Sequence, residues 1–262
     1  MKTQKHINTL KRGEIIEALQ LTKLGSLIKP LRYQLEHNVE FADVCFEDRI
    51  ASILYEVRDD YLDRKLDRLY HRGSGTKPVG ASAEKLSYKP ERNLNREVVK
   101  TLLEMDWVRG PRPYYVTISG ETGTGKSYLA EVLVRQACAV NLNVGYYTCE
   151  SFIKMTDGLT KGIDIDKCFN ALNRKDLIVI EDFGLFPATE ASIQLLFRLI
   201  DRRFGMGALL ITSQYKVADW YGYFAGEQNN NALADAVMDR LRNNSQNIEL
   251  KGPSLRGANP RI

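Results

Sequence analysis

The residues whose types and spacing most clearly imply chemistry lie in the segment Gly120–Ser127. This segment reads GETGTGKS and matches the pattern G-x-x-x-x-G-K-S without a gap. Glycines let the backbone approach an anion closely, and successive N–H groups of such a loop point inward at phosphate oxygens. The Lys126 ammonium would neutralise the outer phosphates, and the Ser127 hydroxyl would be a magnesium ligand. The segment therefore predicts a loop that binds the phosphates of ATP together with Mg²⁺. The residues predicted to contact the nucleotide are Gly120, Glu121, Thr122, Gly123, Thr124, Gly125, Lys126, Ser127 and Tyr128.

Two carboxylates end a second apolar segment, Leu177–Asp182, which reads LIVIED. A phosphate loop binds its ligand but does not hydrolyse it. Hydrolysis needs one carboxylate that holds magnesium and another that orients or deprotonates the attacking water. By position, we predict that Glu181 holds Mg²⁺ together with Ser127 and that Asp182 acts on the water. Acids are common at strand ends in α/β proteins, and it is the phosphate loop upstream that favours the catalytic interpretation.

A third apolar segment, Leu209–Gln214, also ends in polar residues. In a parallel sheet, neighbouring strand ends gather at one edge. Gln214, or Ser213 beside it, is therefore predicted to reach the γ-phosphate or the water. The alternative is that this end caps the next helix.

The elements that must position these residues alternate between strand and helix after Tyr114. Helices are expected over 126–140 and 189–203. The strand candidates are Tyr114–Ile118, Val144–Thr148, Leu177–Ile180, Ala208–Thr212 and Asn247–Leu250. This alternation predicts an α/β fold with a parallel sheet that is flanked by helices on both faces.

The first part of the chain has a different pattern. Apolar residues recur at the helical period over 15–35 and again over 46–69, so residues 1–72 are predicted to form a small all-helical N-terminal domain. Residues 73–90 contain several glycines and prolines and are predicted to be a linker. The α/β domain is expected over 91–262.

Composition excludes some classes of protein. The 262 residues contain no apolar run near the ~18 residues that span a bilayer. The N-terminus is basic and polar and lacks the apolar region of a signal peptide, so we expect a cytoplasmic protein without a membrane partner.

The formal net charge is +4, and the surplus lies upstream of Tyr114. A basic surplus of this kind suits binding to a polyanion, although ordinary solubilising lysines and arginines would give the same net charge. Within the first 35 residues, only Glu14 and Glu17 oppose Lys2, Lys5, Lys11, Arg12, Lys23, Lys29 and Arg32. A second, smaller excess comprises Lys77, Lys85, Lys89, Arg92 and Arg96.

The order of these motifs closely resembles that of the IstB-like AAA+ ATPases. These are transposition helper proteins of bacterial insertion sequences, related to DnaC-type helicase loaders and more distantly to DnaA. The resemblance covers nearly the whole chain except 73–90. It rests on the phosphate loop and on Leu177–Gly184, Ile211–Gln214, Leu233–Leu241 and Ile248–Gly252, with Phe46–Ile50, Asn93–Asn95 and Asp106–Trp107 upstream.

The resemblance implies an AAA+ core that oligomerises with ATP and shares its active sites between neighbouring subunits. Arg240 matches the position of the family's arginine finger, which acts on the nucleotide of the next subunit. A guanidinium suits this role because it stabilises the charge spread over the transferring phosphoryl oxygens. The alternative is a surface arginine paired with Asp239 or Asp235.

The sequence departs from the family pattern in two places. The first acid after the strand is Glu181, where aspartate is usual, and its longer side chain leaves the division of roles with Asp182 open. The chain also ends about twenty residues after Arg240, so the helical lid of AAA+ proteins is expected to be reduced or absent. Arg256 is then the candidate for a nucleotide sensor.

The sequence thus favours a transposition helper. Such a protein would be an ATPase that oligomerises on duplex DNA and helps a cognate transposase select and use a target site. The N-terminal domain would supply DNA or partner contacts. Two alternatives remain open, a DnaC-like replicative helicase loader and an ATP-dependent binding module with little turnover.

Overall fold

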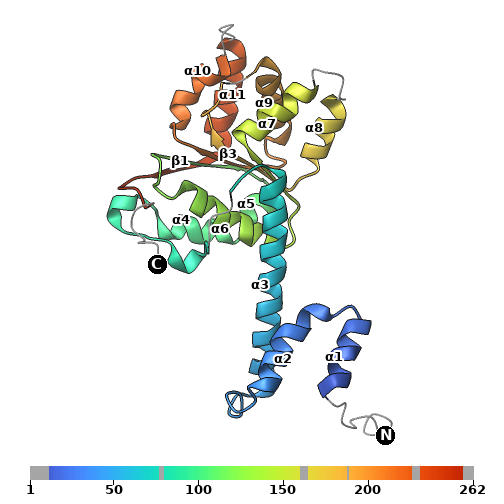
Figure 1. The fold of residues 1–262 in the computed structure, drawn as a ribbon. Helices are drawn as coiled ribbons and strands as arrows, with labels where there is room; N and C mark the ends of the chain where they lie inside the picture. Colours follow the sequence, from blue (N-terminus) through green and yellow to red (C-terminus); the bar gives the residue numbers. More distant parts are fainter. Residues whose placement is uncertain (1–11, 77–79, 160–164, 188, 226–230, 256–262) are drawn as a thin grey trace. The chain divides into compact units, whose positions relative to one another are not determined.

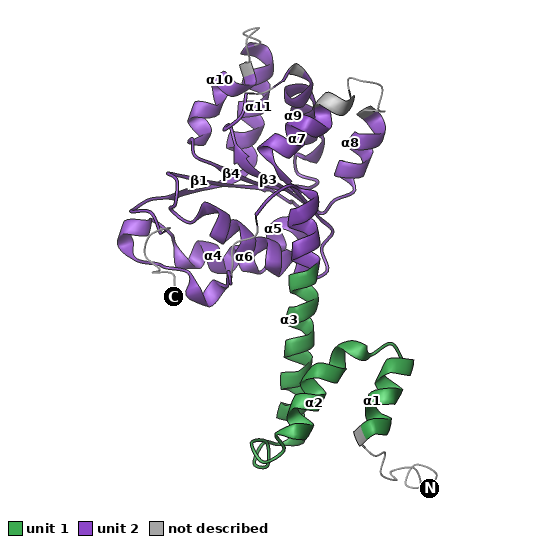
Figure 2. Cartoon of the chain, in the orientation of Figure 1, with its two compact units in different colours: residues 1–64 green, residues 65–262 purple. Residues whose placement is uncertain are grey.

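The computed structural model describes residues 12–76, 80–159, 165–187, 189–225 and 231–255. The chain divides into two compact units, Met1–Arg64 and Lys65–Ile262 (Figure 2). This boundary lies before the predicted domain end at residue 72, because the residues after Arg64 pack within the second unit. Lys65 Nζ donates a hydrogen bond to the Cys138 carbonyl oxygen at 3.2 Å, and Tyr70 is buried.

The first unit is helical, as predicted. It contains α1 (Arg12–Leu21), a 3-10 turn (Gly25–Leu27), α2 (Ile28–Glu36) and the first part of α3 (Phe46–Arg72). A buried glutamine joins α2 to α3. Gln34 Nε2 donates to the Arg49 carbonyl oxygen at 3.0 Å and to Ser52 Oγ at 2.7 Å, and Gln34 Oε1 accepts from Arg49 Nε at 3.2 Å. Both the nitrogen and the oxygen of the Gln34 amide therefore have hydrogen-bond partners, which offsets the free-energy cost of burying a polar group.

The second unit is built on five parallel strands in the order β2-β3-β4-β1-β5, which confirms the predicted α/β fold. Strands buried on both faces need continuous apolar sequence, which explains the runs in β1, β3 and β4. The strands are β1 (Tyr115–Gly120), β2 (Val144–Thr148), β3 (Leu177–Phe183), β4 (Ala208–Ser213) and β5 (Ser245–Leu250).

Helices cover both faces of this sheet (Figure 1). One face carries α4 (Arg96–Leu103), α5 (Asp106–Arg109) and α6 (Lys126–Ala139). The other carries α7 (Cys149–Leu159), α8 (Ile165–Asn173), α9 (Glu190–Arg203), α10 (Tyr221–Ala225) and α11 (Asn231–Asn244). Short 3-10 turns lie at Ala83–Lys85, Pro90–Arg92 and Val217–Trp220. The described residues after β5, 251–255, form no helix, and Arg256 lies outside the described residues. Among the described helices, none is both long and apolar enough to cross a membrane.

One member of the predicted basic surface is not on the surface. Arg92 is only 7% exposed, and its guanidinium donates to the Pro253 carbonyl oxygen at 2.7 Å. It therefore joins the chain before α4 to the chain after β5, and its buried guanidinium is not part of an exposed basic surface. Arg96 places its guanidinium 4.7 Å from the centre of the Tyr88 ring, and it is exposed, as are Lys85 and Lys89. Lys77 lies outside the described residues.

The strand order explains how the predicted site residues come together. Because β3, β4 and β1 are adjacent and parallel, their carboxyl ends lie at the same edge of the sheet. The phosphate loop follows β1, Glu181 and Asp182 lie at the end of β3, and Gln214 follows β4. Residues far apart in sequence are thereby brought to one place.

Candidate nucleotide-binding site

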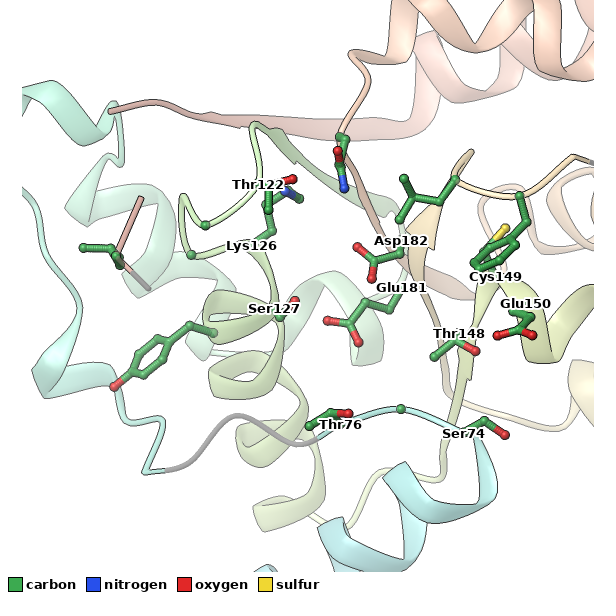
Figure 3. Close-up of a pocket in the computed structure, with 18 residues that line it drawn as sticks. Ser74, Thr76, Thr122, Lys126, Ser127, Thr148, Cys149, Glu150, Glu181 and Asp182 are labelled. Atoms are coloured by element: carbon green, nitrogen blue, oxygen red, sulfur yellow. The ribbon is translucent and has the colours of Figure 1, made fainter. Parts of the chain in front are cut away.

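A cavity of about 720 Å³ opens at this edge of the sheet (Figure 3). Its volume falls within the range of small-molecule sites, roughly 300–1,000 Å³. Six of the nine predicted nucleotide contacts line it, together with Glu181, Asp182 and Gln214. The six are Thr122, Gly123, Gly125, Lys126, Ser127 and Tyr128.

The phosphate loop ends where α6 begins. Gly125 caps α6 with a φ of 101°, a conformation that residues with a side chain rarely adopt. The first N–H groups of α6 have no partner within the helix, and the helix dipole makes this end favourable for an anion. The Lys126 side chain is buried, and its ammonium donates to the carbonyl oxygens of Gly120 at 2.8 Å and Glu121 at 2.9 Å. The cation thus lies inside the loop that is predicted to surround the phosphates.

Glu181 is buried beside Ser127. Its Oε2 accepts a hydrogen bond from the Tyr146 hydroxyl, while Oε1 is buried without a hydrogen-bond partner among the described residues. Burial raises the pKa of the Glu181 carboxyl, and Asp182 adds to this, whereas the hydroxyls of Ser127 and Tyr146 and the Lys126 ammonium oppose it. The Glu181 carboxylate and the Ser127 hydroxyl lie near each other (Figure 3), and hard oxygen ligands of this kind are the ones that Mg²⁺ prefers. The residues present therefore suit the ion.

Asp182 reaches the same cavity through an irregularity in β3. Successive side chains of a regular strand point to opposite faces, so Glu181 and Asp182 would normally diverge. Here the register shifts between Ile180 and Phe183, and Asp182 has a φ of 56°. Its backbone N–H donates to Thr212 Oγ1 at 3.0 Å. This bulge allows two consecutive carboxylates to line one cavity.

The remaining phosphate-loop residues, Gly120, Glu121 and Thr124, line a neighbouring cavity of about 700 Å³. Gln214 borders both cavities. Ser213, the alternative to Gln214, is buried, and its hydroxyl donates to the Phe183 carbonyl oxygen at 2.7 Å. Among the residues that the structure describes, Ser213 therefore has a structural hydrogen-bond partner and Gln214 has none.

Tyr128 faces the cavity from α6 and also holds the chain that precedes α4. Its hydroxyl oxygen accepts a hydrogen bond from the Ser82 backbone N–H at 3.1 Å. This segment belongs to the predicted linker 73–90.

Arg240 lies on α11 and lines neither cavity. Its guanidinium forms an ion pair with Asp201 of α9, donates to the Ala236 carbonyl oxygen at 2.9 Å and lies 5.7 Å from the centre of the Phe197 ring. Asp201 thus takes the place of the predicted intrachain partners, Asp239 and Asp235. Within one chain these contacts hold α11 against α9, and the arginine-finger role remains a prediction about a neighbouring subunit.

Sequence reasoning missed several parts of the cavity wall, including Leu185, Phe186 and Leu255. Ser74, Gly75 and Thr76 line the cavity although they lie in the predicted linker. The chain that leaves β2 contributes Thr148, Cys149 and Glu150. The small residues of Gly73–Gly75 were a signal for close backbone packing as well as for a linker, and the end of β2 lies at the same sheet edge as the other strand ends.

Comparisons with known proteins agree with this geometry. A family model described as IstB-like ATP binding protein matches residues 16–261. An insertion sequence ATP-binding protein of Sinorhizobium fredii is 29% identical over 177 residues, which cover 67% of this chain and 68% of that protein. The structure of DnaI aligns with a TM-score of 0.56 at 14% identity, covering 66% of this chain and 92% of the DnaI chain. The DnaC helicase loader aligns with a TM-score of 0.51 at 14% identity, covering 66% and 98%, and at these identities the two structures show a shared fold alone. The chain therefore belongs to the family of IstB-like ATP-binding proteins, and it shares the fold of the DnaI and DnaC structures.

Proposed function

We propose that this protein is a Mg²⁺-dependent ATPase that oligomerises on duplex DNA and helps a cognate transposase select and use a target site. The observation that carries the ATPase proposal is the convergence of Lys126, Glu181 and Asp182 on one cavity. A phosphate-binding cation, a metal-binding carboxylate and a second carboxylate for water are the parts that phosphoryl transfer to water requires.

Each residue has a role that follows from its place in the cavity. Lys126 and the N-terminus of α6 would hold the β- and γ-phosphates. Ser127 and Glu181 would hold Mg²⁺, which when bound neutralises charge on the phosphate oxygens. Asp182 would orient the attacking water and accept its proton, and Gln214 would contact the γ-phosphate or the water.

The proposed catalytic site is completed by a neighbouring subunit. Arg240 would be supplied by the next subunit of a homo-oligomer, since it lies outside the cavities of its own chain. Its guanidinium would stabilise charge that develops on the transferring phosphoryl group.

The proposed partners follow from the family and from charge. The relative from Sinorhizobium fredii is named as an insertion sequence ATP-binding protein, and a transposase is the enzyme that moves such an element. Exposed basic side chains in the first unit include Lys23 and Arg32. They support contacts with phosphates of duplex DNA, which position a protein without reading sequence.

The test is ATP hydrolysis by the full chain, measured with and without Mg²⁺ and with and without duplex DNA. We expect hydrolysis that requires Mg²⁺ and rises when DNA promotes assembly. ATP binding without measurable turnover in every condition, including with the cognate transposase, would contradict the ATPase proposal and favour a binding module.

A further inference from the structure

A tyrosine outside the predicted set contacts Glu181, which lies at the acidic end of the cavity. Tyr146 lies in β2, is 2% exposed, and donates its hydroxyl hydrogen to Glu181 Oε2. The bond occupies one carboxylate oxygen. The other, Oε1, is the buried oxygen without a partner among the described residues. Tyr146 therefore fixes the carboxylate with one oxygen anchored and one available.

The ring of Tyr146 is itself held in place. The Tyr70 ring, near the end of α3, lies with its centre 4.1 Å away at an interplanar angle of 35°. Gly75 lies so close that a Cβ on it would be 2.3 Å from the Tyr146 hydroxyl oxygen. The Gly73 carbonyl oxygen accepts a hydrogen bond from the Thr148 N–H at 3.0 Å. The end of α3 and the chain that follows it thus enclose the ring, and its hydroxyl keeps one direction.

We propose that Tyr146 is a positioning residue that orients Glu181 for Mg²⁺ binding. This proposal rests on the proposed function. Hydrogen bonds to a metal ligand fix its orientation, and their loss typically costs ~10–100-fold in metal affinity. The anchor matters here because glutamate has one more rotatable bond than aspartate, and ordering a side chain costs conformational entropy.

The test is equilibrium binding of a fluorescent ATP analogue to the full chain at increasing Mg²⁺ concentration. Tyr146→Phe removes the hydroxyl and keeps the enclosed ring. We expect this variant to need about 10-fold more Mg²⁺ for half-maximal enhancement of binding. Its affinity for the analogue without Mg²⁺ should stay at the wild-type value.

Tyr147→Phe is the matched control. Tyr147 is the next residue of β2, so its side chain points to the opposite face of the sheet, where its ring packs edge-on against Phe152 with centres 6.3 Å apart. The control loses the same atom from the same strand and should keep the wild-type Mg²⁺ dependence. Glu181→Gln should itself weaken the Mg²⁺ dependence, and adding Tyr146→Phe to it should cause no further change, because the two residues act through one interaction.

The outcomes separate the two proposals. If the affinity of the wild-type protein for the ATP analogue does not depend on Mg²⁺, both the Mg²⁺-dependent function and the positioning role of Tyr146 are overturned. A Mg²⁺-dependent wild type with Tyr146→Phe equal to Tyr147→Phe would overturn the positioning role alone. Additive effects of Tyr146→Phe and Glu181→Gln, or a Tyr146→Phe protein that does not fold in a thermal-unfolding scan, would also overturn it in favour of a structural role.

Discussion

The backbone N–H of Asp182 donates a hydrogen bond to the hydroxyl oxygen of Thr212 in the adjacent strand, at 3.0 Å. Asp182 is held there in the left-handed region, with a φ of 56°. For a residue with a side chain, this conformation costs roughly 1–3 kcal/mol and persists where neighbouring groups impose it. The bond to Thr212 is one such constraint, and it links the backbone of β3 to the direction of a candidate catalytic carboxylate.

Thr212→Val should therefore slow hydrolysis while leaving the binding of an ATP analogue near normal. Thr212 is fully buried, so the variant leaves the Asp182 N–H without its acceptor, at a cost of about 1–3 kcal/mol in the free energy of unfolding. Thr117→Val is the control, because Thr117 is also buried in the sheet but donates to the Asn247 side chain. Chemical denaturation and steady-state hydrolysis are the measurements. Equal hydrolysis by the two variants would contradict a role for Thr212 in directing Asp182.

Lys126→Ala should remove tight ATP binding. The variant loses the cation that is buried inside the loop, and hydrogen bonds to charged groups contribute about 1.5–3 kcal/mol, which corresponds to roughly 10- to 100-fold in affinity. Equilibrium binding of a fluorescent ATP analogue measures the effect. Lys100→Ala, on the exposed side of α4, is the control and should bind normally. Wild-type affinity in Lys126→Ala would overturn the assignment of the phosphate loop.

Asp182→Asn and Glu181→Gln should separate two functions. Asp182→Asn should keep ATP bound, stop turnover and trap any ATP-dependent assembly, because an amide cannot accept the proton of the water. Glu181→Gln should weaken the Mg²⁺ dependence of ATP binding. Parallel binding and hydrolysis assays decide this. Normal hydrolysis by Asp182→Asn beside an inactive Glu181→Gln would show that the two roles are reversed.

The sheet and the phosphate loop were predictable because they depend on local sequence. Apolar runs predicted β1, β3 and β4. The eight consecutive residues Gly120–Ser127 contain both the glycines that the loop conformation needs and the lysine and serine predicted to bind phosphate and Mg²⁺. The left-handed bulge at Asp182 was not predictable, because aspartate adopts this conformation only occasionally and its constraint comes from a neighbouring strand.

Residue types also failed to reveal long-range partners. Arg92 has the sequence features of a surface arginine, yet it binds the Pro253 carbonyl oxygen, 161 residues later. Arg240 pairs with Asp201 on another helix, whereas the sequence suggested acids on its own helix. Tyr146 is one of two adjacent tyrosines, and only the alternation of β2 together with the packing of 73–75 distinguishes it from Tyr147. Such contacts are set by packing between elements, which local periodicity does not encode.

Arg240→Ala should bind ATP almost normally as an isolated subunit but lose hydrolysis and cooperative assembly together. A guanidinium that acts on a neighbour's nucleotide is worth on the order of 10³-fold in turnover. Mixing Arg240→Ala with Lys126→Ala protein should partly restore hydrolysis, since each supplies what the other lacks. Asp201→Asn is the control, because it removes the intrachain partner and keeps the guanidinium. No rescue at any mixing ratio would indicate that Arg240 acts only within its own chain.

The most direct test of the proposed function is competition between duplex and single-stranded DNA of equal length for the full chain. Binding is measured with ATP and Mg²⁺ at two salt concentrations, with ATP omitted as the control. The proposal predicts ATP-promoted binding that prefers the duplex, shows weak sequence preference and falls steeply with salt, because contacts to phosphates release counterions. A clear preference for the single strand would contradict the transposition role and favour a helicase loader. Absent or salt-insensitive binding to both would instead indicate a protein that acts through protein partners alone.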